Sequence, residues 1–346
     1  MREHANDWLL TLFANSRFGY GRRALAFRPK RGRCVSGVIS LSGGQRIFLK
    51  QDPAERSAFL EQEAAVLTAL SANGSSQLAP RLIDFDPEQR LLITESVDGY
   101  VPLDRHLRRT LLADPAAATA AGLTLSRLHE HAPEMSGTAV RIPFPLAEIA
   151  PLTPEDFAAR PGGYAQLAAF LHQSRDAVEK LRSRWRSSHF IHGDFKADNL
   201  LLRIDPRLKG QPPIVIADWE MAGVGDPLWD IGSFVGSVLL AWMQALAPAA
   251  ASADALTGQD ANPARRQIGY FLLTYRHMAP KVFAATDSFA ATAFQYAGIF
   301  MLHRVAVGLD INGHLDPAAS LLLAFGGSLL NHPERAVASL LGGMAL

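Results

Sequence analysis

The residues of this chain that could do chemistry together lie in one short polar segment, residues 192–199, which reads HGDFKADN. Asp194 offers a carboxylate that can accept a proton, and Asn199, five positions later, offers an amide oxygen that can bind a metal ion. A phosphoryl transfer from a nucleotide needs a carboxylate that orients and deprotonates the attacking hydroxyl, together with oxygen ligands for Mg²⁺. The types and spacing of Asp194 and Asn199 therefore predict part of a phosphoryl-transfer site.

A second metal ligand follows from the strand pattern after this segment. Residues 200–204 and 214–217 are apolar, strand-like runs joined by a turn-rich stretch; Asn199 opens the first run and Asp218 closes the second. If the two runs pair as an antiparallel hairpin, the start of one lies beside the end of the other. Asn199 and Asp218 would then meet at one edge, with the hard oxygen atoms that Mg²⁺ prefers.

The N-terminal part of the chain supplies a cation for the phosphates. Lys50 ends a strand-like run, residues 46–50, and a helical pattern follows it. On that helix Glu63 lies at the centre of the apolar face formed by Phe59, Leu60, Val66, Leu67 and Leu70. A carboxylate that points inward needs a partner, and Lys50 is the natural one. Glu61 falls on the opposite face, where we expect it to be solvated.

The elements around these residues predict an α+β fold. Up to residue 97 the pattern is mostly one of short strands separated by turn residues, interrupted by a single helix with a capping-box-like start at Asp52, Pro53 and Glu55. From residue 98 onwards long Ala- and Leu-rich helical patterns dominate. We expect a small antiparallel-sheet N-lobe over residues 1–97 and a larger, mainly helical C-lobe over residues 98–346, joined by a hinge at 96–99.

Two segments stand apart from these lobes. Residues 1–21 contain an amphipathic run, and we expect an N-terminal helical extension there. Residues 131–163 carry six prolines and little periodicity. Loops of such length within a folded domain are usually functional or mobile, so we interpret this segment as a substrate lid.

The composition excludes several classes of function. With 34 basic and 33 acidic residues the net charge is +1, which gives no strong attraction to nucleic acid or to an anionic membrane. The single cysteine, Cys34, cannot form an internal disulfide, so we expect a reducing, cytoplasmic compartment. Residues 231–251 carry no charge and include Gly232 and Gly236, but they contain a proline and follow an Asp-rich segment, which favours a buried helix over a membrane span.

Several ordered motifs resemble the aminoglycoside phosphotransferase and choline kinase superfamily, whose members have a two-lobed protein-kinase-like fold. The matching stretches are HGDFKADN at 192–199, IADWE at 216–220, GDPLWD at 225–230, LITE at 92–95 and LSRLH at 125–129. The resemblance extends over about residues 33–240. It implies a kinase that uses ATP or GTP with Mg²⁺ and has an alcohol group as acceptor.

The resemblance also implies a role for each matching residue. Asp194 would be the catalytic base, Asn199 and Asp218 the Mg²⁺ ligands, Lys50 the phosphate-binding lysine and Glu63 its partner.

Further roles are implied around these residues. Backbone groups near Glu95 to Val97 would hold the adenine, and Lys196 would reach the transferred phosphate. Asp230 would brace the catalytic loop, and Asp226 would have a structural role.

The chain departs from the kinase pattern before Lys50. No G-x-G-x-x-G occurs there, and the loop expected over the phosphates, residues 28–33, reads RPKRGR. Its basic side chains either contact phosphate or form a solvated basic turn, and the sequence favours neither.

The acceptor is left open by the sequence. A pocket for a polycation should be acidic, whereas from Gly232 onward the chain has six acidic and six basic residues. The alternatives are a small molecule that is aminoglycoside-, amino-alcohol-, sugar- or hydroxyacyl-like, and the Ser or Thr hydroxyls of a peptide. A pseudokinase would not need Lys50, Asp194, Asn199 and Asp218 together, and a metal-dependent phosphatase would have no use for an inward Lys–Glu pair.

Overall fold

The computed structural model describes residues 10–11, 13–16, 18, 24–30, 35–52, 57–131, 146, 163–246, 261–284 and 288–342. Two compact units make up the chain. The first unit comprises Met1–Tyr100 and Arg203–Ala222, and the second comprises Val101–Leu202 and Gly223–Leu346. The first unit thus includes a stretch, Arg203–Ala222, that the sequence analysis places in the C-lobe.

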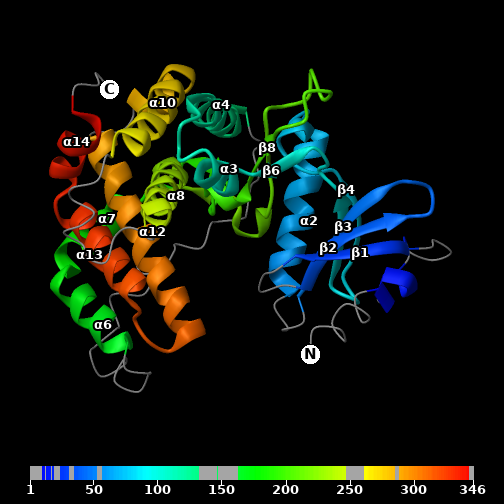
Figure 1. Cartoon of the computed structure of the whole chain (residues 1–346), viewed down its shortest axis with the longest axis horizontal. Helices are drawn as coiled ribbons and strands as arrows, with labels where there is room; N and C mark the ends of the chain where they lie inside the picture. The colour runs from blue at the N-terminus through cyan, green and yellow to red at the C-terminus, as the bar shows by residue number, and fades with distance from the viewer. Residues whose placement is uncertain are drawn as a thin grey trace. The chain divides into compact units, whose positions relative to one another are not determined.

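The first unit is built on one antiparallel sheet with the strand order β1-β2-β3-β5-β4 (Figure 1). Alternate residues of β2, β3 and β5 point to one side of this sheet and form a buried apolar cluster with Phe13, among them Ile39, Ile47, Leu49 and Ile93. The strands are β1 (Ala24–Lys30), β2 (Val35–Leu41), β3 (Arg46–Gln51), β4 (Leu82–Asp86) and β5 (Leu91–Glu95).

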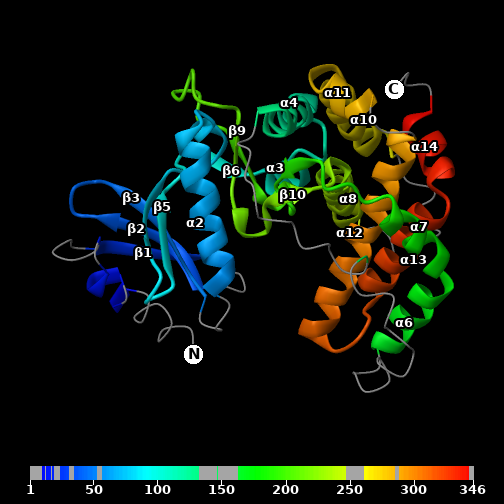
Figure 2. The same ribbon diagram turned by 180° about the vertical axis from the view of Figure 1, so that it is seen from behind.

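Helix α2 (Ser57–Ala72) packs on this sheet at β4 and β5 (Figure 2). Leu60, Glu63, Val66, Leu67 and Leu70 are buried, as the apolar periodicity predicts, whereas Glu61 is exposed. Residues 53–56 lie outside the described residues, so the expected helix start is not described. A short 3-10 turn, η1 (Ser76–Leu78), follows α2.

The basic stretch 28–33 differs from the loop that we expected. Arg28 and Lys30 belong to β1 and lie opposite Val38 and Ser36 of β2. Pairing with β2 gives these residues regular backbone hydrogen bonds. These bonds do not depend on an alternation of apolar and polar side chains. Residues 31–33 lie outside the described residues, as do most residues of the predicted extension 1–21 and of the predicted lid 131–163.

The stretch Arg203–Ala222 is joined to the rest of the first unit by backbone hydrogen bonds. The N–H groups of Ile204 and Asp205 donate to the carbonyl oxygen of Gly99 at 2.9 and 3.1 Å. The N–H of Arg203 donates to the carbonyl oxygen of Pro213 at 2.9 Å, as expected for the hairpin predicted between residues 200–204 and 214–217. The short strands here are β6 (Tyr100–Pro102), β8 (Leu200–Arg203) and β9 (Ile214–Ile216), followed by the 3-10 turn η3 (Trp219–Met221).

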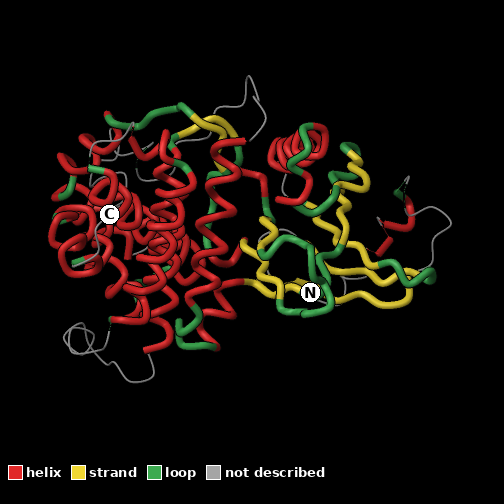
Figure 3. The backbone as a smooth tube through the Cα atoms, turned by 90° about the horizontal axis from the view of Figure 1, so that it is seen from above, coloured by secondary structure: helices red, strands yellow, loops and turns green. Residues whose placement is uncertain are grey.

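The described part of the second unit is mostly helical (Figure 3). A two-stranded antiparallel ribbon pairs β7 (His189–Ile191) with β10 (Gly223–Gly225), and the 3-10 turn η2 (Ala197–Asn199) ends the segment after β7. The helices are α3 (Leu103–Arg109), α4 (Pro115–His131), α6 (Gly163–Gln173), α7 (Arg175–Ser183), α8 (Pro227–Leu246), α10 (Asn262–Met278), α11 (Pro280–Ala284), α12 (Phe289–Asn312), α13 (Pro317–Asn331) and α14 (Pro333–Leu341).

Helix α8 packs along α12, and glycines on α8 allow the close approach. A Cβ atom on Gly232 would lie 2.4 Å from Cβ of Tyr296, and one on Gly236 would lie 2.6 Å from Cδ1 of Phe300. The described part of the uncharged run, up to Leu246, is therefore a helix packed in the core, as predicted. No helix among the described residues is long and apolar enough to cross a membrane.

Candidate active site

Lys50 stands at the centre of a buried cluster of charges in the first unit. Its ammonium group donates to Oε2 of Glu63 at 2.8 Å, to Oε2 of Glu220 at 2.7 Å and to Oδ1 of Asp218. The side chains of Lys50 and Glu63 are 8% and 7% exposed. The ion pair that we predicted from the helical periodicity is thus present, and two further carboxylates share the lysine.

The charges of this cluster do not balance. Burial alone would lower the pKa of Lys50, but Glu63, Asp218 and Glu220 together outweigh it and raise that pKa, so the ammonium group stays protonated. Burial raises the pKa of Glu63, and the neighbouring ammonium opposes this shift. One ammonium thus faces three carboxylates, with an oxygen of each within 4.8 Å of the others. A divalent cation would offset the remaining negative charge, and carboxylate oxygens are ligands that suit Mg²⁺.

The alternation of side chains along β3 explains where Lys50 lies. A hydrogen bond between α2 and η3 explains where Glu63 lies. Lys50 points to the face of β3 opposite that of Ile47 and Leu49. Oε1 of Glu63 accepts the backbone N–H of Trp219 at 3.2 Å, while its Oε2 accepts the lysine. The indole of Trp219 is fully buried and donates to the carbonyl oxygen of Ile216 at 2.8 Å, which fixes the turn after β9.

Asp218 occupies an uncommon backbone conformation just before η3. Its φ and ψ angles are 70° and 61°, in the left-handed region. Residues with a Cβ avoid this region at a cost of about 1–2 kcal/mol, and Asp and Asn visit it more readily than most. The turn therefore places a carboxylate at a position where few other side chains are tolerated.

Glu220 is the functional candidate that sequence reasoning missed. It follows Asp218 by two positions in the IADWE stretch, and its side chain is 11% exposed. The only available signal was its place in that matching motif, because a 3-10 turn has no apolar periodicity to show which way a carboxylate points.

The catalytic loop of the second unit runs from β7 through η2. Nζ of Lys196 donates to Oδ2 of Asp194 at 2.5 Å. Nδ2 of Asn199 donates at 3.0 Å to the same Oδ2 and to the carbonyl oxygen of Asp194. Because the amide nitrogen of Asn199 is engaged in this way, its Oδ1 is the atom that a metal ion would take. The loop thus holds Asp194, Lys196 and Asn199 together.

Side chains of helix α8 hydrogen-bond to the backbone of this loop. The fully buried carboxylate of Asp230 accepts the N–H of His192 at 2.7 Å and that of Gly193 at 2.9 Å. The indole of Trp229 donates to the carbonyl oxygen of Gly193 at 2.7 Å, and Oγ of Ser237 accepts the N–H of Ala197 at 3.0 Å. Three side chains of one rigid helix therefore fix the loop backbone on both sides of Asp194.

Asp226 lies at the start of the same helix but holds other parts of the unit. Its carboxylate accepts the N–H groups of Arg186 and Leu228 at 3.2 and 3.0 Å and the hydroxyl of Tyr296 at 2.9 Å. Burial raises the pKa of Asp226, and these hydrogen bonds oppose the shift. Its partners are structural groups, in line with the structural role that the resemblance implies.

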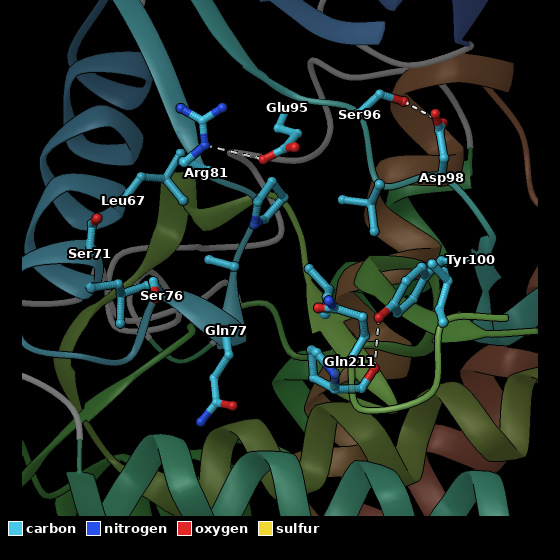
Figure 4. A pocket seen from close by; sticks show the side chains of 17 residues that line it. Leu67, Ser71, Ser76, Gln77, Arg81, Glu95, Ser96, Asp98, Tyr100 and Gln211 are labelled. Carbon is cyan, nitrogen blue, oxygen red and sulfur yellow. Dashed lines mark hydrogen bonds and ion pairs between the residues drawn. The ribbon is translucent and has the colours of Figure 1, made fainter. Parts of the chain in front are cut away.

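A pocket of about 480 Å³ lies in the first unit (Figure 4). Its wall includes Glu95 and Val97, the predicted adenine-contacting residues, and Leu67 and Ser71 of α2. Arg81 pairs with Glu95 at 3.2 Å on its rim. We call Lys50, Glu63, Asp218 and Glu220 the lysine cluster. None of these four residues lines the pocket, so the pocket and the lysine cluster are separate features of the first unit.

The two groups of predicted residues belong to different units. Lys50, Glu63 and Asp218 lie in the first unit, and Asp194 and Asn199 lie in the second. The predicted meeting of Asn199 with Asp218 therefore stays a prediction.

Comparison with known proteins decides the family. A model of the phosphotransferase enzyme family matches residues 38–268, a range that includes every residue of the lysine cluster and of the catalytic loop. The chain belongs to this family. It is a phosphotransferase with a two-lobed, kinase-like α+β fold that acts on hydroxyl groups. No curated protein sequence matches the chain at a significant level.

Solved structures of other proteins have a similar fold. A choline/ethanolamine kinase family protein from Mesorhizobium loti is 18% identical with a TM-score of 0.59, over 97% of this chain and 99% of that one. A glucosamine kinase in complex with glucosamine, ADP and inorganic phosphate is 16% identical with a TM-score of 0.57, over 97% and 87%. An amicoumacin kinase in complex with AMP-PNP, Ca²⁺ and Ami is 16% identical with a TM-score of 0.59, over 90% and 88%.

Proposed function

We propose that this phosphotransferase moves the γ-phosphoryl group of ATP or GTP to a hydroxyl group of a small molecule, with Mg²⁺ as cofactor. The observation that carries the proposal is the buried Lys50, held by Glu63 and Asp218 in one unit. A protonated lysine beside a candidate metal ligand is what nucleotide phosphates require. The complexes of the structural relatives with ADP and with AMP-PNP and Ca²⁺ support a nucleotide and a divalent cation.

The oxygen donors of the chain fit Mg²⁺. Asp218 and Asn199 would hold the ion, with Glu220 beside them, since carboxylate and amide oxygens are hard ligands. When bound, Mg²⁺ neutralises charge on the phosphates. Lys50 binds the phosphates while Glu63 keeps it in position. Asp194 orients the acceptor hydroxyl and accepts its proton, and Lys196 neutralises charge on the transferred group.

The segment at Glu95 to Val97 is the proposed contact of the nucleotide base. The N–H groups of Glu95 and Ser96 donate to the carbonyl oxygens of Arg81 and Arg46 at 2.9 and 3.2 Å. In the described part of the chain the N–H of Val97 makes no such hydrogen bond, which leaves it for a ring nitrogen of the base. We assign nucleotide binding to the lobe of residues 1–97 and acceptor binding to that of residues 98–346.

The acceptor is proposed to be aminoglycoside-, amino-alcohol-, sugar- or hydroxyacyl-like. The names of the relatives, which include choline/ethanolamine and glucosamine kinases, support a small alcohol. A peptide Ser or Thr hydroxyl is the second candidate. The six acidic and six basic residues after position 231 provide no excess of negative charge for a polycation, which disfavours an aminoglycoside. We place the enzyme in the cytoplasm, where nucleotide and Mg²⁺ are abundant.

The test is a transfer assay with Mg²⁺ and γ-labelled ATP or GTP against amino-alcohols, amino sugars, aminoglycosides, hydroxyacyl compounds and Ser/Thr peptides. We expect a phosphorylated product from at least one class. Asp194→Asn should lower kcat by about 10²- to 10⁴-fold, the usual contribution of a general base, with nucleotide Kd unchanged. Asp176→Asn, at an exposed position of α7, is the matched control and should keep full activity. Absence of both nucleotide binding and transfer in the wild-type protein would contradict the proposal.

A further inference from the structure

Asp230, which braces the catalytic loop, is itself held by a buried pair of residues from two other helices. Nε2 of His129, on α4, lies 3.3 Å from Oδ2 of Asp230. Nδ1 of His129 lies 2.7 Å from the hydroxyl of Tyr275, on α10. The side chains of His129 and Asp230 are 0% exposed, and Tyr275 is fully buried. A continuous polar chain therefore runs through the core from α10 to the catalytic loop.

We propose that His129 and Tyr275 are positioning residues for the catalytic loop, and that Tyr275 acts by anchoring the ring of His129 through Nδ1. The inference rests on the proposed function, because it assigns the two residues to the placement of Asp194. Neither of them touches the reacting atoms. They act through Asp230.

The donors and acceptors of the polar chain formed by Tyr275, His129 and Asp230 allow one arrangement with a neutral imidazole. The carboxylate of Asp230 can only accept hydrogen bonds, so Nε2 of His129 must carry the proton that faces it. In a neutral imidazole Nδ1 is then the acceptor, and the hydroxyl of Tyr275 must donate to it. Burial and the nearby Asp230 raise the pKa of Tyr275 well above its ordinary value, so the hydroxyl keeps its proton. Asp230 thus sets the tautomer of His129, and the hydroxyl of Tyr275 pairs with the remaining ring nitrogen and holds the ring in place.

Ring packing restricts the pair further. The rings of His129 and Tyr275 meet edge to face at 5.7 Å and 81°, and Tyr275 also stacks against Phe271. A buried imidazole in such surroundings cannot turn to find another acceptor without disrupting the core. The direction of its N–H is therefore set by the hydrogen bond at its other nitrogen.

The consequence for the loop follows from the two oxygens of Asp230. Oδ2 accepts both His129 and the N–H of His192, and Oδ1 accepts the N–H of Gly193. If the ring lost its anchor at Nδ1 and turned, Oδ2 would lose the Nε2–H donor, and the carboxylate would no longer be held in its present orientation. Because Gly193 precedes Asp194, the carboxylate of the base would be displaced. Groups that support a reacting residue in this way typically change activity by about 10- to 100-fold when removed.

The chain provides a matched control in Tyr296. Its hydroxyl is also buried and donates to a buried carboxylate of α8, but that carboxylate is Asp226, which does not hydrogen-bond the catalytic loop. Tyr275→Phe and Tyr296→Phe each remove one buried hydroxyl and leave the ring. A purely structural role would make the two variants behave alike.

The experiment compares both variants with the wild-type enzyme by steady-state kinetics, nucleotide calorimetry and ¹⁵N NMR of histidine-labelled protein, with the His129 signal assigned by its loss in His129→Gln. We expect Tyr275→Phe to lower kcat about tenfold, leave nucleotide Kd unchanged and shift the Nδ1 signal of His129, which loses its hydrogen-bond donor. Tyr296→Phe should change neither. His129→Gln, which keeps a donor near the Nε2 position, should retain more activity than His129→Leu.

The NMR result does not depend on turnover, so failure of the proposed function and failure of this inference are distinguishable. A wild-type enzyme without transferase activity would refute the former. Equal kcat in the Tyr275→Phe and Tyr296→Phe variants of an active enzyme, or a His129 signal that Tyr275→Phe leaves unchanged, would refute the latter.

Discussion

Glu63 accepts the backbone N–H of Trp219 at 3.2 Å, although the two residues are 156 positions apart in the chain. The same carboxylate holds Lys50 through its other oxygen. Glu63 therefore links three elements of the first unit, namely α2, β3 and η3. The glutamate thus not only pairs with the lysine but also fixes the turn that carries Glu220.

Replacement of Glu63 by glutamine should show this double role. The amide keeps the shape but not the charge, so Lys50 loses one of three compensating carboxylates. We expect the free energy of unfolding to fall by about 1–3 kcal/mol and nucleotide Kd to rise. Urea unfolding and calorimetry measure these effects. Glu61→Gln, two positions away on the exposed face of α2, is the control, and equal effects of the two variants would argue against the buried pair.

Glu220 should affect the Mg²⁺ requirement. Its carboxylate lies 2.7 Å from Nζ of Lys50 and forms one side of the oxygen cluster with Glu63 and Asp218. Glu220→Gln removes one negative charge, so we expect the Mg²⁺ concentration for half-maximal activity to rise about tenfold. Activity titrated with MgCl₂ at fixed nucleotide measures this. The exposed Glu88→Gln is the control, and an unchanged Mg²⁺ response in Glu220→Gln would exclude Glu220 from the metal site.

Trp229 should contribute to catalysis through one hydrogen bond. Its indole donates to the carbonyl oxygen of Gly193 at 2.7 Å, whereas the indole nitrogen of Trp242, on the same helix, has no partner among the described residues. We expect Trp229→Phe to lower kcat about tenfold, because a buried carbonyl at the catalytic loop loses its donor at a cost of about 1–3 kcal/mol. Trp242→Phe should change kcat little. If both variants had the same kcat, the bond would have no catalytic role.

The packing of α8 on α12 can be tested with two glycines. In Gly232→Ala the new methyl group would lie 2.4 Å from Cβ of Tyr296 and 2.9 Å from the carbonyl oxygen of Ala293, so the helices would have to separate. We expect a loss of about 1–3 kcal/mol in the free energy of unfolding. Gly308→Ala, in α12 with no atom within 4 Å of the new Cβ, should instead add about 0.5–1 kcal/mol. Thermal or urea unfolding of both variants decides, and a stabilising Gly232→Ala would refute the close packing.

Features with a local period could be predicted from the sequence. Glu63 was found because a helix repeats every 3.6 residues and its neighbours on that face are apolar. Strand β3 was predicted at residues 46–50 and extends one residue further, to Gln51.

Features that depend on partners distant in the chain could not be predicted. Strand β1 was interpreted partly as a loop because residues 28–33 stand where the kinase pattern has its phosphate loop, and only pairing with β2 makes it a strand. The bond from Trp229 to Gly193 could not be predicted, since nothing local shows where a carbonyl thirty-six positions away will lie. Glu220 was missed for the same reason, because its direction depends on the left-handed turn at Asp218.

The composition of the first unit from Met1–Tyr100 and Arg203–Ala222 has a consequence for biosynthesis. A ribosome releases the N-terminal stretch early, but Asp218 and Glu220 are made only after the whole catalytic loop and the helices α3, α4, α6 and α7. Until residue 222 has emerged, the nascent chain carries Lys50 and Glu63 without their later partners, and the first unit lacks its second stretch. We expect this interval to be the stage of synthesis at which a chaperone is most needed.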